Sequence, residues 1–180
     1  MNRLTRVSKF LSYHLRHRPD LLNLKLASGG WVEVDKLLQA AEERNFSLSF
    51  EELQRVVEQN GKKRFSFNPQ GNLIRANQGH SVAVDLQLKP LNPPDILYHG
   101  THSDAIVAIT QQGLKKMSRH HVHLSSDIDT AKSIGTRRGR PIIIAVNSRA
   151  MSEAGYLFYR SDNGVWLSET VPSQYLQIDK

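Results

Sequence analysis

The sequence of 180 residues predicts an α+β protein built from two lobes. Three observations lead to this prediction. The first half holds helical patterns followed by a hairpin pattern, the second half alternates short strands with short helices, and three prolines fall within residues 89–94 between them. The length allows one large domain or two small lobes, and we expect lobes at residues 1–89 and 95–180.

The first lobe begins with a predicted helix over residues 4–17. Its apolar residues recur at helical spacing and define one buried face: Leu4, Val7, Phe10, Leu11 and Leu15. Lys9, Ser12 and Arg16 share another face of this helix. Because Pro19 cannot continue a helix, we expect the helix to end near Arg16.

Two further helices and a hairpin complete the predicted first lobe. One helix is expected over Val34–Glu43, and another begins at Ser49, where Glu52 completes the capping-box pattern. A β-hairpin is expected over residues 64–75, with its turn at residues 68–71. Three helices followed by a hairpin are typical of a winged-helix-like lobe. This shape is common in nucleic-acid-binding proteins, although many winged helices bind only protein.

The second lobe is predicted to be rich in strands, with one further strand over residues 82–88 before it, where apolar residues alternate. Its strands are expected at residues 96–98, 122–124, 142–146, 157–159, 165–167 and 175–178, the run at 142–146 being buried. A helix capped by Ser103 or Asp104 should end at Gly113, and Asp127 should cap another. The sequence 162–164 indicates a hairpin turn.

Composition narrows the functional classes. The formal net charge of +7 and the pI of about 9.8 suit a polyanionic partner such as RNA, although charge alone does not separate this from an ordinary basic protein. The absence of cysteine excludes disulfides, thiol nucleophiles and thiolate-bound zinc. No apolar run approaches the roughly 20 residues of a membrane span, and no signal core follows Met1, so we expect a cytoplasmic monomer by default.

Two basic segments of the first lobe are candidates for phosphate chemistry. Arg16 and His17 end the first helix; arginine matches phosphate oxygens with a rigid fork of donors, and histidine transfers protons near neutral pH. The alternative is a solvated helix end whose cations complement the helix dipole. Arg64 alternates with Phe65 and Phe67, whose rings should face the core, so Arg64 is either a functional group or a surface charge.

Two segments of the second lobe suit ligand binding. In the segment Tyr98–Thr101, Gly100 allows close approach of a ligand to the backbone, and His99 and Thr101 can bind ribose hydroxyls. An ordinary strand-to-loop turn explains this segment equally well. The second segment holds His120, His121 and His123, which invite a metal hypothesis; it is the weaker interpretation, because no cysteine or interleaved acid supports it.

Taken in order, these segments resemble the RNA 2′-phosphotransferase family, which removes a splice-junction 2′-phosphate from tRNA. The resemblance covers nearly the whole chain. The order and spacing of the motifs together support it more strongly than any single motif does. The motifs are Ser8-Lys9-Phe10-Leu11-Ser12, Leu15-Arg16-His17, Gly30-Trp31-Val32, Arg64-Phe65, Ile74-Arg75-Ala76-Asn77-Gln78-Gly79-His80-Ser81, Leu97-Tyr98-His99-Gly100-Thr101, His121-Val122-His123-Leu124-Ser125 and Asn163-Gly164-Val165-Trp166-Leu167.

The resemblance implies an RNA-facing, winged-helix-like N-terminal lobe and an ADP-ribosyltransferase-like, NAD-binding C-terminal lobe. It implies that the catalytic residues, converging beside the dinucleotide, are Arg16, His17, Arg64 and Arg119. It implies that the NAD-binding residues are His99, Gly100, Thr101, His123, Ser125 and Val165. An apolar residue at 165, where many ADP-ribosyltransferases carry a glutamate, suits an anionic nucleophile that a carboxylate would repel.

The implied reaction has two steps. The RNA 2′-phosphate attacks the anomeric carbon of the nicotinamide ribose and nicotinamide leaves; the ribose 2″-hydroxyl then attacks the phosphorus. The second step releases RNA with a free 2′-hydroxyl and ADP-ribose 1″,2″-cyclic phosphate. Arginines would grip the phosphate, which carries about −1.5 to −2 charges at pH 7, so the chemistry requires no metal. We expect His17 to move one proton in the second step.

Two other functions fit the same residues. One is an ADP-ribosyltransferase that stops after the first step and modifies nucleic-acid phosphate ends or protein. The other is a winged-helix protein that binds RNA or DNA without catalysis, in which the second half would be dispensable. Accumulation of the first-step product would indicate the former function, and failure to bind NAD the latter.

Overall fold

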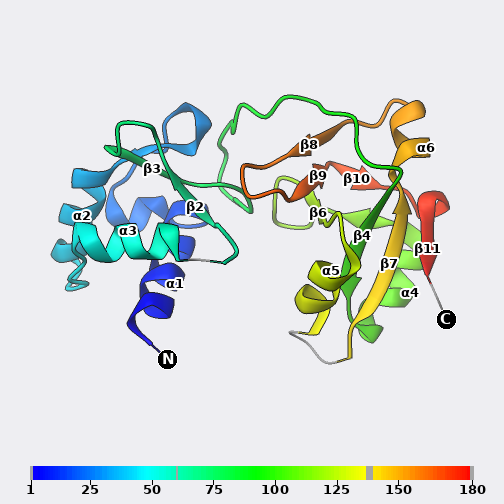
Figure 1. Cartoon of the computed structure of the whole chain (residues 1–180), viewed down its shortest axis with the longest axis horizontal. Helices are drawn as coiled ribbons and strands as arrows, with labels where there is room; N and C mark the ends of the chain where they lie inside the picture. The colour runs from blue at the N-terminus through cyan, green and yellow to red at the C-terminus, as the bar shows by residue number, and fades with distance from the viewer. Residues whose placement is uncertain (1, 60, 137–139, 179–180) are drawn as a thin grey trace. The chain divides into compact units, whose positions relative to one another are not determined.

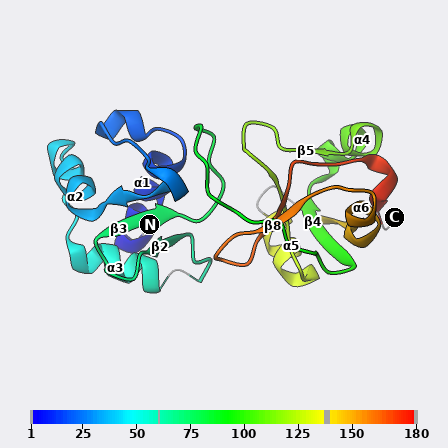
Figure 2. The same cartoon turned by 90° about the horizontal axis from the view of Figure 1, so that it is seen from above.

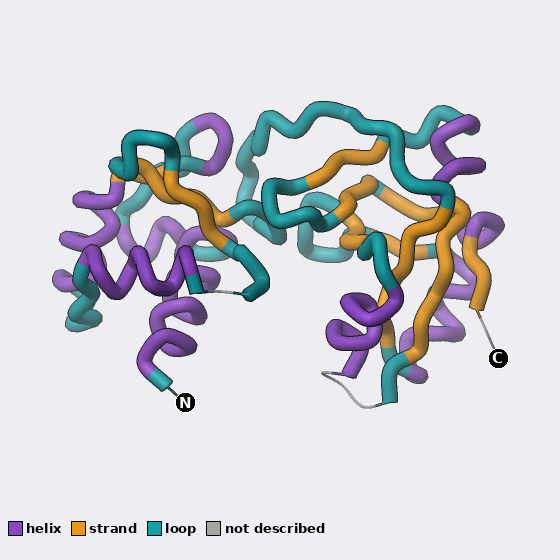
Figure 3. Tube along the Cα trace, in the orientation of Figure 1, coloured by secondary structure: helices purple, strands orange, loops and turns teal. Residues whose placement is uncertain are grey.

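The computed structural model describes residues 2–59, 61–136 and 140–178 (Figure 1; Figure 3). The chain divides into two compact units, Met1–Gln87 and Leu88–Lys180, and each has its own hydrophobic core (Figure 2). Both units combine helices with small antiparallel sheets, so the predicted α+β class is confirmed. No helix within the described ranges is long and apolar enough to cross a membrane.

Among its described residues, the first unit contains three α-helices, a three-stranded antiparallel sheet of order β1-β3-β2 and two 3₁₀ turns. Its elements are α1 (Arg3–Arg16), η1 (Pro19–Leu22), η2 (Ser28–Gly30), β1 (Val32–Glu33), α2 (Val34–Glu43), α3 (Phe50–Glu58), β2 (Phe65–Phe67) and β3 (Leu73–Ala76). The three predicted helices and the hairpin are therefore confirmed, and the core forms between the helices and the sheet.

Local signals explain where the helices of this unit begin. The Asn2 side chain accepts a hydrogen bond from the Thr5 amide and caps α1. The predicted capping box is present, because Ser49 Oγ accepts from the Glu52 amide and the Glu52 carboxylate accepts from the Ser49 amide. Glu52 also pairs with Arg3 at 2.6 Å, which lowers the pKa of this carboxyl to about 2 and joins α3 to α1.

The strand predicted over residues 82–88 is wrong. The backbone there is irregular, and Gln87 has a φ of 55°, which no strand residue adopts. The apolar alternation serves another purpose, since Leu86 is buried against Gly30. The Asp85 carbonyl accepts a hydrogen bond from the Gly29 amide at 2.8 Å, so the segment covers the η2 turn instead of joining a sheet.

The second unit contains three small antiparallel sheets and three α-helices among its described residues. The sheets have the orders β11-β7-β4, β6-β9-β8 and β10-β5. The elements are β4 (Ile96–Thr101), α4 (Ser103–Gln112), β5 (Leu114–Lys115), β6 (Val122–Leu124), α5 (Ile128–Gly135), β7 (Ile142–Asn147), α6 (Ser148–Glu153), β8 (Phe158–Arg160), β9 (Trp166–Ser168), β10 (Thr170–Val171), η4 (Ser173–Tyr175) and β11 (Leu176–Ile178).

Most predicted elements of the second unit are confirmed, and three details differ. The N-cap of α4 is His102, without a side-chain cap, instead of Ser103 or Asp104. Strand β7 is fully buried only at Ile144 and Val146, the two residues that face the hydrophobic core. The proline-rich segment at residues 89–94 is hydrogen-bonded to β8, with the Leu91 amide donating to the Phe158 carbonyl at 2.8 Å.

Candidate active site

A cavity of about 690 Å³ lies within the second unit, between the ends of β4 and β6, one face of α4 and the loop after β5. It brings together five of the seven site residues predicted for the second lobe, and these five span 24 positions of the chain. On its wall are His99, Gly100, Thr101, Arg119 and His123. The volume is in the range of pockets that enclose small ligands, roughly 300–1,000 Å³.

Backbone pairing fixes how β4 and β6 meet at this cavity. Tyr98 and Ser125 form a two-way antiparallel bridge, with both N–H···O distances at 2.8 Å. This bridge places His99 beside His123, and the Nδ1 of His99 donates to the His123 carbonyl at 3.0 Å, since a carbonyl can only accept. The proton of a neutral His99 therefore resides on Nδ1, which leaves Nε2 as a hydrogen-bond acceptor, suited to a hydroxyl.

Arg119 sets the tautomer of the second histidine. Its Nη1 lies 3.1 Å from Nδ1 of His123, and a guanidinium can only donate. His123 Nδ1 is therefore the acceptor, and the ring's proton is on Nε2 when the ring is neutral. The result is a chain of contacts from Arg119 through His123 to His99 along one side of the cavity.

The cavity is basic on one side and apolar on another. Lys115, Lys116 and Arg119 supply cations, and no carboxylate lines it among the residues that the structure describes. Ala105 and Ile109 of α4 form an apolar part of the cavity wall. Cations favour phosphate groups and an apolar surface favours a flat ring, so a phosphorylated ligand with a base or ring matches both.

The structure gives a new reason for glycine at position 100. A Cβ there would lie 1.8 Å from the carbonyl oxygen of Ala131 and 3.1 Å from the amide nitrogen of Gly135. Helix α5 thus packs directly onto the β4 backbone, and this packing alone requires glycine, whether or not a ligand also approaches it.

Two predicted NAD-binding residues are not on the wall of this cavity. Ser125 is buried at the bridge with Tyr98, directly after β6. Val165 is half-buried directly before β9, and its carbonyl accepts from the Ser161 amide in the turn between β8 and β9. Ser125 follows the lining residue His123 by two positions, whereas Val165 is distant in sequence from every lining residue, and neither lines the cavity.

The three catalytic candidates of the first unit come together at the end of α1. Arg16 Nη2 donates a long hydrogen bond of 3.5 Å to the Arg64 carbonyl, and its guanidinium lies over the Phe65 ring. His17 Nδ1 is 2.9 Å from Ser81 Oγ, and the Ser81 amide donates to the Arg16 carbonyl. These contacts hold Arg16 and His17 at the helix terminus.

Sequence analysis did not predict the contact of Ser81 with His17 or the positions of Lys115 and Lys116 on the cavity wall. Ser81 positions His17 across 64 residues of chain, and no local pattern announces such a contact. Lys115 and Lys116 precede the histidine-rich segment by a short loop, and in the sequence only their charge could have indicated a place in the site. In the described part of the chain, no three His, Cys, Asp or Glu side chains form a group suited to a metal ion.

Acidification should destabilise the second unit. Burial lowers the pKa of His99 below its ordinary 6.5, with a further contribution from Arg119, and burial followed by His120 and Lys116 lowers the pKa of His121. The unfolded chain then takes up protons near pH 6.5 that the folded unit does not, so stability is full above pH 6.5 and falls below it. Thermal unfolding followed from about pH 7.5 to 5.5 should show a decline of at most about 1.4 kcal/mol per pH unit per histidine.

A His99→Asn variant keeps a donor toward the His123 carbonyl but does not titrate. Its stability should depend less steeply on pH over the same range, while Lys36→Ala on α2 should leave the dependence as in the wild type. An unchanged slope in His99→Asn would show that this ring does not contribute.

The fold and the cavity define an α+β protein with a pocket whose charged lining residues, in the described part of the chain, are cations. Residues 2–170 match the family model described as "RNA 2'-phosphotransferase, Tpt1 / KptA family". The chain therefore belongs to the RNA 2′-phosphotransferase family, as its motifs predicted.

Relatives at high identity agree with this assignment. The chain is 56% identical over 176 residues to a protein of Nostoc punctiforme named "Probable RNA 2'-phosphotransferase", covering 98% of this chain and 97% of the relative. Proteins of the same name from Trichormus variabilis and Acaryochloris marina are 54% and 50% identical, with coverage of 98% and 96% of this chain and 97% and 95% of the relatives.

Proposed function

We propose that this protein transfers an internal 2′-phosphate of an RNA to NAD⁺ and releases nicotinamide, 2′-hydroxyl RNA and ADP-ribose 1″,2″-cyclic phosphate. Membership of the RNA 2′-phosphotransferase family supports the RNA half of this reaction. The observation that carries the NAD half is the cavity of the second unit, where Arg119, His123 and His99 are linked by hydrogen bonds on a wall without carboxylates among the described residues.

The residues of this cavity fit a dinucleotide. Lys115, Lys116 and Arg119 match a pyrophosphate, and the unprotonated Nε2 of His99 suits a ribose hydroxyl. The apolar side of α4 suits a flat ring. NAD⁺ supplies the electrophilic anomeric carbon and the nicotinamide leaving group, while the protein orients both.

Arginines are proposed to hold the phosphate in both steps. In the first step, an oxygen of the RNA 2′-phosphate bonds to the anomeric carbon as the bond to nicotinamide breaks; the nucleophile is already ionised and needs no general base. In the second step, the 2″-oxygen bonds to phosphorus as the bond to the RNA 2′-oxygen breaks. Arg16, Arg64 and Arg119 would neutralise the phosphoryl oxygens throughout, each charge-assisted hydrogen bond contributing about 1.5–3 kcal/mol.

His17 is proposed to move a proton in the second step. The 2″-hydroxyl must lose a proton, and the departing RNA oxygen must gain one. The contact between His17 and Ser81 fixes the ring through Nδ1, which leaves Nε2 as the atom for proton transfer.

Incubation of the protein with NAD⁺ and a short RNA bearing one internal 2′-phosphate tests this function. Nicotinamide and the cyclic phosphate should both appear without added metal, as measured by chromatography. His17→Ala should slow the second step by roughly 10²- to 10⁴-fold, so that RNA joined to ADP-ribose accumulates. Second-step turnover of His17→Ala at the wild-type rate would remove the proposed role of this residue.

The same assay separates the alternatives. If the wild type accumulates RNA joined to ADP-ribose and stops, the protein is a one-step ADP-ribosyltransferase. If titration of NAD⁺ shows no binding and RNA still binds, a non-catalytic nucleic-acid-binding protein is indicated, and the proposal fails.

A further inference from the structure

The 77–81 segment, which follows β3, belongs to one of the motifs that carry the family resemblance, and the proposed function uses only Ser81 of it. Two of its polar side chains are buried, since Asn77 is 5% exposed and His80 is 1% exposed. A polar side chain leaves water at little cost only where it gains hydrogen-bond partners. The contacts of this segment therefore indicate what it does.

The first end of the 77–81 segment holds the chain where it enters β2. The Asn77 amide donates to the Arg64 carbonyl at 2.9 Å, and its side-chain Nδ2 donates to the Lys63 carbonyl at 2.8 Å. Lys63 has a φ of 40°, a conformation that residues other than glycine rarely adopt and that persists where neighbouring contacts enforce it. Because Asn77 binds the carbonyls of both residues, it fixes the direction in which the Arg64 side chain leaves the backbone.

The other end of the segment holds the end of α1. The Ser81 amide donates to the Arg16 carbonyl at 2.9 Å, and Ser81 Oγ lies 2.9 Å from Nδ1 of His17. A hydroxyl can donate to this nitrogen when it is unprotonated and accept from it when it is protonated. Ser81 can therefore hold the His17 ring in both protonation states, and a group that moves a proton passes through both.

Two further contacts join the ends of the segment. His80 packs under the η2 turn, where a Cβ added at Gly30 would lie 3.6 Å from its Nε2. Arg16 Nη2 donates at 3.5 Å to the Arg64 carbonyl, the same atom that accepts from the Asn77 amide. The backbone positions of Arg16 and Arg64 are thus linked to each other through residues 77–81.

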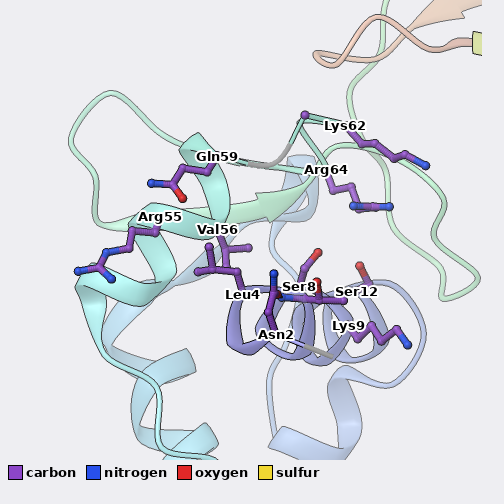
Figure 4. A pocket seen from close by; sticks show the side chains of 12 residues that line it. Asn2, Leu4, Ser8, Lys9, Ser12, Arg55, Val56, Gln59, Lys62 and Arg64 are labelled. Atoms are coloured by element: carbon purple, nitrogen blue, oxygen red, sulfur yellow. The ribbon is translucent and has the colours of Figure 1, made fainter.

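Arg64 lines a cavity of about 680 Å³ within the first unit (Figure 4). The charged residues of its lining, among those described, are the cations Lys9, Arg55, Lys62 and Arg64. Ser12 of α1 also lines this cavity, and it lies one helical turn before Arg16 on the same face of the helix. A shift of Arg64 therefore displaces a charge next to the end of α1.

We propose that Asn77 and Ser81 are positioning residues of the phosphate transfer, which set the places of Arg64 and His17 relative to Arg16. This inference rests on the proposed function, because only that reaction gives the three side chains a common task. A displacement of about 1 Å in a catalytic group can cost roughly 10²-fold in rate. A role in stability alone would leave the rates of the folded protein unchanged.

Single-turnover measurement of both steps, at saturating NAD⁺ and 2′-phosphorylated RNA, tests the Asn77 end. Asn77→Ala should slow both steps by roughly 10- to 100-fold, because Arg16 and Arg64 are proposed to hold the phosphate in each. In steady state, kcat should fall by a larger factor than KM rises, since the groups remain present but misplaced.

Asn68→Ala is the matched control for Asn77→Ala. Asn68 lies at the opposite end of the same hairpin, where its Oδ1 accepts from the Leu73 amide at 2.9 Å. Each variant loses one contact between an asparagine side chain and the backbone, so Tm should fall by roughly 5 °C in both. Asn68→Ala should nevertheless keep both step rates within about twofold of wild type.

A pair of variants tests the Ser81 end. Ser81→Ala should slow the second step by roughly tenfold and leave the first unchanged, so that RNA joined to ADP-ribose accumulates. Ser81→Thr keeps the hydroxyl, and Ser81 is exposed, so the added methyl group has room. This variant should perform the second step within about threefold of wild type.

Nitrogen NMR of labelled arginine and histidine side chains tests the same contacts without turnover. Asn77→Ala should shift the Nε signals of Arg16 and Arg64, and Ser81→Ala should shift the Nδ1 signal of His17. Asn68→Ala should leave all three signals in place.

The inference is overturned if folded Asn77→Ala performs both steps at wild-type rates, if Asn68→Ala loses as much activity as Asn77→Ala, or if Ser81→Thr is no faster than Ser81→Ala. Failure of the proposed function would look different. The wild type would then yield no nicotinamide from any RNA, while shifted NMR signals would still show that residues 77–81 hold these side chains. If the wild type transfers phosphate and the signals do not move, the positioning roles alone are wrong.

Discussion

Replacing Arg119 by alanine should reduce formation of the cyclic phosphate by about three orders of magnitude. Arg119 is the arginine of the cavity wall in the second unit, and it donates to His123, whose carbonyl in turn holds His99. Its loss removes a charge-assisted clamp on a phosphoryl group and frees the tautomer of His123. Removal of comparable groups costs about 10²- to 10⁵-fold in rate. Single-turnover chromatography of both steps is the measurement.

Two further variants make the result specific. Arg119→Lys keeps the charge but not the planar fork, so it should remain at least about tenfold impaired. Arg149→Ala removes an exposed arginine of α6 that pairs with Asp95 and Glu153 and does not line the cavity; it should retain full activity. Because Arg119 is exposed, the free energy of unfolding of Arg119→Ala should lie within about 0.5 kcal/mol of the wild-type value. A folded Arg119→Ala protein with near wild-type turnover would contradict the assigned role.

Gly100→Ala should destabilise the second unit by at least about 3 kcal/mol. The added Cβ would lie 1.8 Å from the Ala131 oxygen and 2.7 Å from its carbonyl carbon, and backbone atoms cannot rotate away as a side chain would. Helix α5 must move as a whole to make room for this Cβ. Overpacking of this kind commonly lowers the free energy of unfolding by roughly 1–3 kcal/mol or more. A loss of this size corresponds to a fall in Tm on the order of 10 °C or more, measurable by calorimetry.

Gly61→Ala is the control for this effect. A Cβ at Gly61 would have no heavy atom within 4 Å, and Gly61 is not among the glycines with positive φ. Its Tm should therefore match or slightly exceed that of wild type, because alanine lowers the entropy of the unfolded chain. If Gly100→Ala melted like Gly61→Ala, α5 could not be packed on β4 as described.

Local patterns predicted the elements well where neighbouring residues decide the structure. The capping box of Ser49 and Glu52 and the stop at Pro19 both act within one helical turn, and both helices end or begin where these residues require. The alternation at residues 82–88 was misleading for the same reason. Alternation specifies a two-faced extended segment but not a partner strand, and here Leu86 is buried against a glycine turn instead.

The candidate site divides in the same way. The family resemblance implied a catalytic role for Arg119 and NAD binding for His99 and His123, and the structure places all three on one cavity wall. The contact of Ser81 with His17 joins residues 64 positions apart, so residue type alone could not reveal it. The prediction for Gly100 named the residue for a possible ligand, whereas the observed neighbour is the backbone of α5.

By itself, the sequence determined the α+β class, most of the helices, the hairpins and membership of the RNA 2′-phosphotransferase family, because these follow from short-range periodicity and from motifs in a fixed order. The tertiary structure alone decided which nitrogen of His99 carries the proton, which neighbour forbids a side chain at position 100, and which cations line each cavity. Those properties depend on atoms brought together from separate strands and helices, and hydrogen-bond and steric energies are set by distances of a few ångströms that sequence spacing does not encode.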